Sequence, residues 1–135
     1  MKKKPTIASL KKRLTVYFNR YIRIRDCKGE WGGVCISCGK YFIFSKLQAG
    51  HFVPSTSSAT RFDERNVNAQ CIGCNMFLRG NLIKYFVAME RKYGREVVNE
   101  LIRKKHQTVK WRASVLEDMI VEYKKKVKTL QDKYR

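Results

Sequence analysis

Two pairs of cysteines have the spacing of metal ligands. Cys35 and Cys38 form one C-x2-C pair, Cys71 and Cys74 form the other, and 32 residues lie between the pairs. Two residues between thiols let the chain turn back on one ion, and two such pairs complete a tetrahedral shell. The spacing predicts a structural Zn2+ site. Its closed shell has no place for water, so catalysis must come from other residues.

Two disulfides, or four unrelated core positions, are the alternatives for these cysteines. Residues 1–10 are basic without an apolar signal-peptide core, and no segment is long enough to span a bilayer. We therefore expect a reducing cytoplasm, in which the remaining cysteine, Cys27, is a free thiol.

His51 lies between the two cysteine pairs and is the candidate for catalysis. A neutral imidazole near pH 7 can take a proton from water. Asn66 precedes Cys71 by five residues and Asn75 follows Cys74, so both flank the zinc turn. Each has a structural alternative: His51 as a core histidine, and the asparagines as turn or helix-cap residues.

The charge balance points to a polyanionic partner. Thirty Lys and Arg residues stand against 11 Asp and Glu residues, which gives a net charge of +19. Such self-repulsion is tolerated most easily when nucleic acid neutralises it. An anionic membrane surface is the competing partner, but the basic residues recur along the whole chain rather than on one helix.

The hydrophobic pattern predicts a single α+β domain over residues 1–135 that is mostly helical. Apolar residues at steps of three and four predict an amphipathic helix over 5–27. A zinc-supported core follows at 31–93, with a hairpin at 34–44, a strand at 47–53 and a helix at 71–93. Knuckle, hairpin and helix in this order are typical of the treble-clef, or ββα-metal, arrangement.

Two further helices are expected in the C-terminal part, residues 95–135, at 95–105 and 112–133. The apolar stripe of the last helix has two interpretations, packing on the first helix or formation of a homodimer through a short coiled coil. Trp31 and Trp111 are expected in the core. We expect His106 to be structural or to contact phosphate, and Lys124 to Lys126 to form a solvated helix face.

The ordered motifs resemble a known family. Gly50-His51, Asn66 and Cys71-x-x-Cys74-Asn75 are similar to the HNH nucleases that carry a supporting zinc. More closely, five segments look like the phage recombination endonucleases of the NinG (Rap) type. They are Cys35 to Gly39, Ala49 to His51, Arg61 to Asn66, Gln70 to Asn75 and Gly80 to Leu82.

The resemblance implies roles for individual residues. His51 would be the general base, Asn66 would orient its hairpin, and Asn75 would bind a divalent cation, Mg2+ or Mn2+. HNH nucleases usually have an Asp where this chain has Gly50, so the carboxylate ligand is open. Glu64 is our first choice for that ligand and Asp63 the second, because Mg2+ prefers oxygen ligands.

These expectations combine into a metal-dependent DNA endonuclease that hydrolyses phosphodiester bonds. Arg61, Arg65 and Arg79 would contact the DNA backbone. The resemblance further implies branched recombination intermediates, of the Holliday junction or D-loop type, as substrate, and the bacterial host cytoplasm as location if the protein is phage-encoded. The rival hypothesis is a non-catalytic zinc-containing DNA-binding module, in which His51 only packs.

Overall fold

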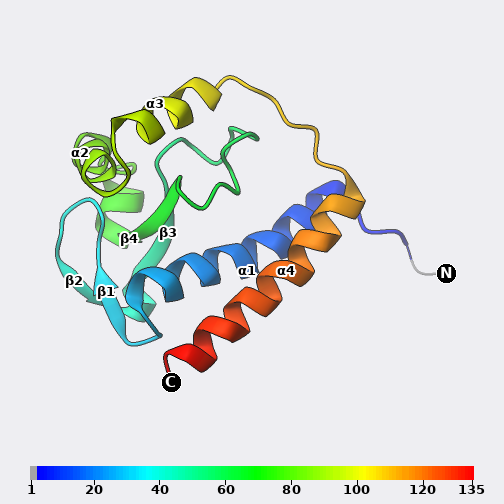
Figure 1. The fold of residues 1–135 in the computed structure, drawn as a ribbon, viewed down its shortest axis with the longest axis horizontal. Helices are drawn as coiled ribbons and strands as arrows, with labels where there is room; N and C mark the ends of the chain where they lie inside the picture. Colours follow the sequence, from blue (N-terminus) through cyan, green and yellow to red (C-terminus); the bar gives the residue numbers. More distant parts are fainter. Residues whose placement is uncertain (1–2) are drawn as a thin grey trace.

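The computed structural model describes residues 3–135 and has an α+β fold in which helices hold more than half of the chain (Figure 1). The helices are α1 (Ile7–Cys27), α2 (Leu82–Tyr93), α3 (Arg95–Lys104) and α4 (Ala113–Lys133). β1 (Gly32–Val34) pairs antiparallel with β2 (Tyr41–Ile43), and β3 (Leu47–His51) pairs antiparallel with β4 (Val67–Cys71). A 3-10 turn (Phe44–Lys46) precedes β3, and a π-helical turn (Gly73–Phe77) follows β4.

Helices α1 and α4 lie side by side along most of their length (Figure 1). The Thr6 hydroxyl caps α1 by accepting a hydrogen bond from the Ser9 amide at 3.1 Å. The two helices bury a shared apolar cluster that includes Leu10, Leu14, Phe18, Leu116, Ile120 and Tyr123. Each such side chain stabilises the fold by roughly 1.5–3 kcal/mol. The stripe of α4 is thus used within the chain, which confirms the packing interpretation.

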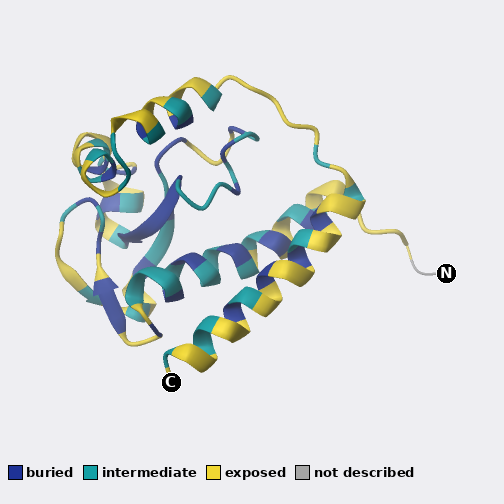
Figure 2. Ribbon diagram, in the orientation of Figure 1, coloured by how far each residue is buried: buried dark blue, intermediate teal, exposed yellow. Residues whose placement is uncertain are grey.

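The β3–β4 pair lies between α1 on one side and α2 with α3 on the other (Figure 1). Every residue of β4 is buried, as the dark blue strand of Figure 2 shows. Arg25 anchors this strand to the end of α1 by donating hydrogen bonds to the backbone oxygens of Glu64 and Val67, both at 2.9 Å. The neighbouring Asp26 carboxylate accepts from the Ala69 amide at 2.7 Å.

The helix expected over 71–93 is wrong in its first half. Its first turn is π-helical, and the helix proper begins only at Leu82. Arg79, Gly80 and Asn81 all have positive φ, a conformation that ends a helix and that glycine adopts without strain. Strand β4 was also not expected, although Val67, Ala69 and Cys71 alternate with the polar residues Asn68 and Gln70, and all five residues are buried.

The two tryptophans differ. Trp111 packs against the α1–α4 cluster with its ring edge-on to Phe62, as expected. Trp31 was expected in the core, and that was wrong: it directly precedes β1 and is 86% exposed. Within residues 3–135, no helix combines the length and the apolar character that crossing a membrane requires.

Candidate metal centre and basic cavity

The four cysteines of the two pairs converge on one point. Their sulfur atoms all lie within 4.8 Å of one another, and the Cys38 and Cys71 sulfurs are 4.0 Å apart. Zinc–thiolate bonds of about 2.3 Å in a tetrahedron place the sulfurs roughly 3.8 Å apart, so the cluster fits an ion such as zinc. The prediction that these residues converge is confirmed. Cys27 lies outside the cluster, and burial raises the pKa of its thiol to about 11.

Backbone and side-chain amides already point at the sulfurs. The Cys38 amide donates to the Cys35 sulfur at 3.5 Å, and the Cys74 amide donates to the Cys71 sulfur at 3.4 Å. The Asn81 side chain donates to the Cys74 sulfur, also at 3.4 Å. Such N–H donors stabilise negative charge on sulfur, which is the form that binds a metal. The donor set therefore suits a thiolate-bound cation.

His51, at the end of β3, is oriented by the loop that follows it. Its Nε2 lies 2.9 Å from the backbone oxygen of Arg61. A carbonyl oxygen only accepts hydrogen bonds, so Nε2 carries the hydrogen and Nδ1 keeps its lone pair. Burial lowers the pKa of His51, and the nearby Arg61 charge adds to this effect. The imidazole is therefore neutral at pH 7 and able to accept a proton at Nδ1.

Asn66 is fully buried and holds the same loop closed. Its Oδ1 accepts from the Val53 amide at 2.8 Å, and its Nδ2 donates to the backbone oxygens of Val53 at 2.9 Å and Thr60 at 3.2 Å. Val53 and Thr60 are the two ends of the loop, and Thr60 directly precedes Arg61. Asn66 thus holds Thr60, the residue before the Arg61 carbonyl that orients His51, and its side chain makes no hydrogen bond to His51 itself.

A cavity of about 430 Å³ opens beside His51, and three of the other predicted site residues lie at its wall. Asn75, Arg61 and Arg79 all line this cavity. The Asn75 side chain donates to the Gln48 side chain at 2.8 Å, which leaves the Asn75 Oδ1 as an oxygen ligand. Among the described residues that line the cavity there is no carboxylate. Its charged groups are arginines, so it is suited to a phosphate.

Glu64 and Asp63 do not line this cavity. The Glu64 carboxylate accepts hydrogen bonds from Tyr123 and Lys126 of α4, both at 2.8 Å. Asp63 pairs with Arg65 at 2.8 Å, and Arg65 also contacts Glu100 of α3 at 2.9 Å. Sequence proximity to Asn66 placed these three side chains near the site, but the loop turns them away from it. The geometry gives no support to Glu64 or Asp63 as cation ligand.

Gly50 has no room for a side chain. A β-carbon at this position would collide with the side chain of Gln70. Gln70 is fully buried and cannot easily withdraw, because its Nε2 donates to the Ser37 hydroxyl at 2.7 Å and to the Gly80 backbone oxygen at 2.6 Å. The glycine before His51 is therefore a requirement of packing, and the space that an Asp would use is filled from β4.

Helix α1 contributes to the cavity as well. Thr15 and Asn19 line it, and the Arg61 guanidinium donates to the Thr15 hydroxyl at 3.3 Å. The buried Asn19 Oδ1 has no hydrogen-bond partner among residues 3–135. Sequence reasoning missed both residues. The only signal was their polarity within an otherwise amphipathic helix, which does not distinguish a cavity wall from solvent.

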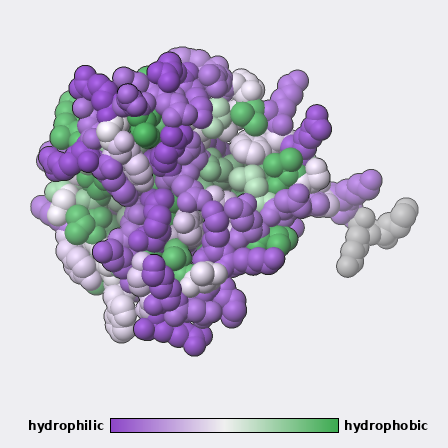
Figure 3. All heavy atoms as spheres, in the orientation of Figure 1, coloured by the Kyte–Doolittle hydropathy of each residue, from purple (hydrophilic) through white to green (hydrophobic). Residues whose placement is uncertain are grey.

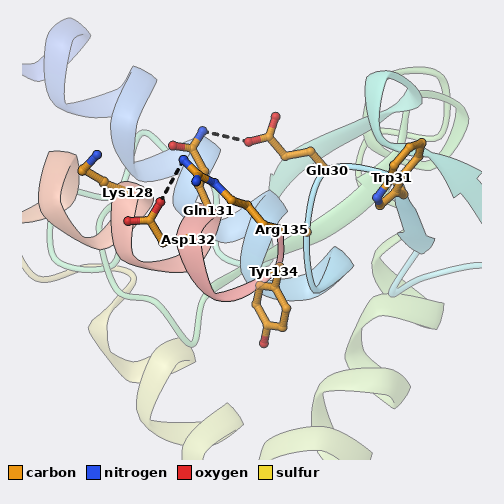
Figure 4. A pocket seen from close by; sticks show the side chains of 8 residues that line it. Glu30, Trp31, Lys128, Gln131, Asp132, Tyr134 and Arg135 are labelled. Atoms are coloured by element: carbon orange, nitrogen blue, oxygen red, sulfur yellow. Dashed lines mark hydrogen bonds and ion pairs between the residues drawn. The ribbon is translucent and has the colours of Figure 1, made fainter.

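A second cavity of about 570 Å³ lies far from His51, at the C-terminal end of α4 (Figure 4). Glu30 and Asp132 line it together with Lys128 and Arg135, and Figure 4 shows their side chains near the end of α4, with Trp31 at some distance from them. The charges of opposite sign offset one another. This cavity therefore lacks the uniformly basic character of the one beside His51.

Comparison with known proteins identifies one family. The family model described as "Bacteriophage Lambda NinG protein" matches residues 2–133. Proteins named "Protein ninG" from Escherichia phage lambda and Escherichia phage 933W are each 34% identical over 115 residues, and that from Salmonella phage P22 is 35% identical over the same length. These matches cover 84% of this chain and 53% to 54% of the relatives.

The chain therefore spans about half the length of the curated relatives that it matches. No solved structure matches it.

Proposed function

Because the chain belongs to the NinG family of bacteriophage lambda proteins, we propose that it is a metal-dependent endonuclease that cuts branched DNA. One observation supports the chemistry above all. His51 is held through Nε2 with a free Nδ1, inside a cavity whose charged lining residues are Arg61 and Arg79. Hydrolysis of a phosphodiester needs a base for water and cations for the developing negative charge, and these groups supply both.

The roles follow from the contacts. His51 accepts the proton of the attacking water at Nδ1. Asn66 acts on His51 only through the loop that it closes, so it is a positioning residue. Arg61 and Arg79 bind phosphate oxygens, and the cysteine cluster binds zinc and fixes the end of β4. We interpret the arrangement as an HNH-like, treble-clef core.

The divalent cation is the second part of the proposal. Asn75 offers a neutral amide oxygen at the cavity, while Mg2+ and Mn2+ favour anionic oxygens. The missing anionic ligand is then a phosphate oxygen of the DNA, and the cation supplies charge stabilisation on that phosphate when bound. We therefore expect weak binding of Mg2+ or Mn2+ to the protein alone and tighter binding with DNA present.

The experiment that tests this function is a cleavage assay with matched substrates. Purified, zinc-loaded protein is incubated with a four-way junction and with a linear duplex of the same sequence, with Mg2+, with Mn2+ and with chelator. The proposal expects cuts in the junction that require the divalent ion. Absence of cutting with every ion would leave the rival function in place.

That rival is a non-catalytic zinc-containing DNA-binding module. One observation favours it, namely that no carboxylate lines the cavity beside His51 within the described chain. The basic surface serves both functions equally, and Figure 3 shows hydrophilic residues over most of one face. The two functions differ in what they require of His51, because a binding module has no use for a half-buried, oriented imidazole with a free Nδ1.

A further inference from the structure

Three consecutive apolar side chains are exposed to solvent at the end of the π-helical turn. Met76, Phe77 and Leu78 are 60%, 81% and 60% exposed. We call these residues the apolar tip. Contiguous large apolar groups exposed on a folded surface are a feature of interaction sites. Among residues 3–135, no cluster of buried residues includes them.

The tip is rigid. The Leu78 amide donates to the Gly73 oxygen at 2.9 Å, the Gly80 amide to the Cys74 oxygen at 2.8 Å, and the Asn81 amide to the Leu78 oxygen at 2.9 Å. Cys74 belongs to the cysteine cluster, so a bound metal would fix the base of the tip further. Little backbone conformational entropy remains to be lost when the tip binds a partner.

The tip borders the proposed active site. Asn75 and Arg79, the residues on either side of it, line the cavity that contains His51. A neighbouring hollow includes Met76 and shares Asn19, Ala49 and Asn75 with that cavity. The two hollows therefore adjoin each other, and Met76 is the residue of the tip that lines one of them. A ligand that fills both hollows contacts Met76, the residue directly before Phe77.

The charge of this region indicates which class of ligand binds there. Residues 31–62 and 65–89 contain no Asp or Glu, although they contain Arg61, Arg79 and several lysines. A purely apolar partner would gain nothing from this bias, whereas a polyanion would. Nucleic acid joins negative charge to flat apolar faces, its bases, within a few ångströms. A cavity lined by arginines beside an aromatic tip matches that combination.

We propose that the apolar tip stacks on exposed bases at the branch point of DNA held in the two hollows, with Phe77 as the main contact. This inference rests on the proposed function and describes how the protein would distinguish a branched substrate from a duplex. Inserting an apolar side chain into a stacked duplex costs the unstacking of a base step. At a branch point part of that stacking is already lost, so insertion is cheaper there.

The test uses a three-way junction with 2-aminopurine at the branch and a duplex with the same base inside, in chelator so that no cleavage occurs. Phe77→Ala should weaken junction binding by about 5-fold to 100-fold, the range expected for one stacked base. It should also abolish the change in 2-aminopurine emission and leave duplex binding unchanged. Phe77→Trp should keep both the junction affinity and the emission change of the parent protein. Val121→Ala, which removes an apolar group that is 53% exposed on α4, is the matched control.

Equal junction binding and equal emission for Phe77→Ala and the parent protein would overturn the inference. So would a change of molar mass in light scattering on Phe77→Ala without DNA, because the tip would then be a contact between two copies of the chain. Failure of the nuclease is read separately: a parent protein that never cuts with Mg2+ or Mn2+ can still show the Phe77-dependent emission change. In that case the stacking surface stands and the nuclease does not.

Discussion

The Nε2 atom of His51 lies 2.9 Å from the backbone oxygen of Arg61, and this contact decides which nitrogen of the imidazole is free. Because the carbonyl only accepts, the free lone pair is on Nδ1. The residue before this carbonyl, Thr60, is held by Asn66, which also binds Val53. Orientation of the imidazole thus depends on a buried amide, and the resemblance to HNH nucleases implied this positioning role for Asn66.

Replacement of His51 tests the base directly. His51→Ala should lower the rate of junction cleavage by about 100-fold or more, the usual scale for loss of a general base. Its affinity for DNA should stay unchanged, since the arginines remain. His106→Ala is the control, because it removes the other histidine, which is exposed beyond the end of α3. Parental cleavage by His51→Ala would contradict the assignment.

The pH profile of cleavage should reflect the lowered pKa of His51. Burial and the Arg61 charge favour the neutral imidazole, so its pKa in the folded protein lies below the ordinary 6.5. Cleavage should therefore remain full above pH 6.5 and fall only as the pH drops through the lower value. The unfolded chain binds the proton more readily, so the stability that His51 contributes is also lost in this acid range. Measuring the cleavage rate and the urea midpoint of unfolding as functions of pH checks that both fall as the pH is lowered.

Asn66→Ala should reduce both stability and rate. The change leaves the Val53 amide and two backbone oxygens without their buried partner, at about 1–3 kcal/mol for each unpaired group. The loop then no longer fixes the Arg61 carbonyl, so cleavage should fall although His51 is intact. Urea denaturation gives the first effect, and cleavage at a temperature where the variant stays folded gives the second. Asn99→Ala, at an exposed position of α3, should change neither.

The sequence predicted the parts of this fold that follow simple periodicity or ligand spacing. Helices α1 and α4 and the convergence of the four cysteines are confirmed, because apolar steps of three and four and C-x2-C pairs depend on local geometry. The break at Arg79 to Asn81 was missed, since the apolar pattern continues through it. Glu64 could not be placed, because its direction is set by Tyr123 and Lys126, about 60 residues away in sequence.

Loss of one cysteine ligand should release the metal and destabilise the core. In Cys71→Ser, the hydroxyl is a poor zinc ligand, and the end of β4 loses its link to Cys35 and Cys38. Metal analysis should show less than one zinc per chain, and the melting transition should move to lower temperature. Cys27→Ser, outside the cluster, should keep full zinc. Full zinc and an unchanged transition in Cys71→Ser would show that the cluster is not a metal site.

The cation ligand can be identified by comparing Asn75 with Glu64. Burial by itself raises the pKa of Glu64, but its contacts with Lys126 and Tyr123 outweigh burial and lower the pKa, so the carboxylate is charged and already engaged. Glu64→Ala should therefore cost stability on the order of 1 kcal/mol or less, because the pair is partly exposed, and leave the Mg2+ or Mn2+ requirement of cleavage unchanged. Asn75→Ala removes the amide oxygen at the cavity and should raise that requirement by on the order of tenfold. Titrating cleavage with each ion measures both. A raised ion requirement in Glu64→Ala with none in Asn75→Ala would mean that the loop rearranges on DNA and brings the carboxylate to the phosphate.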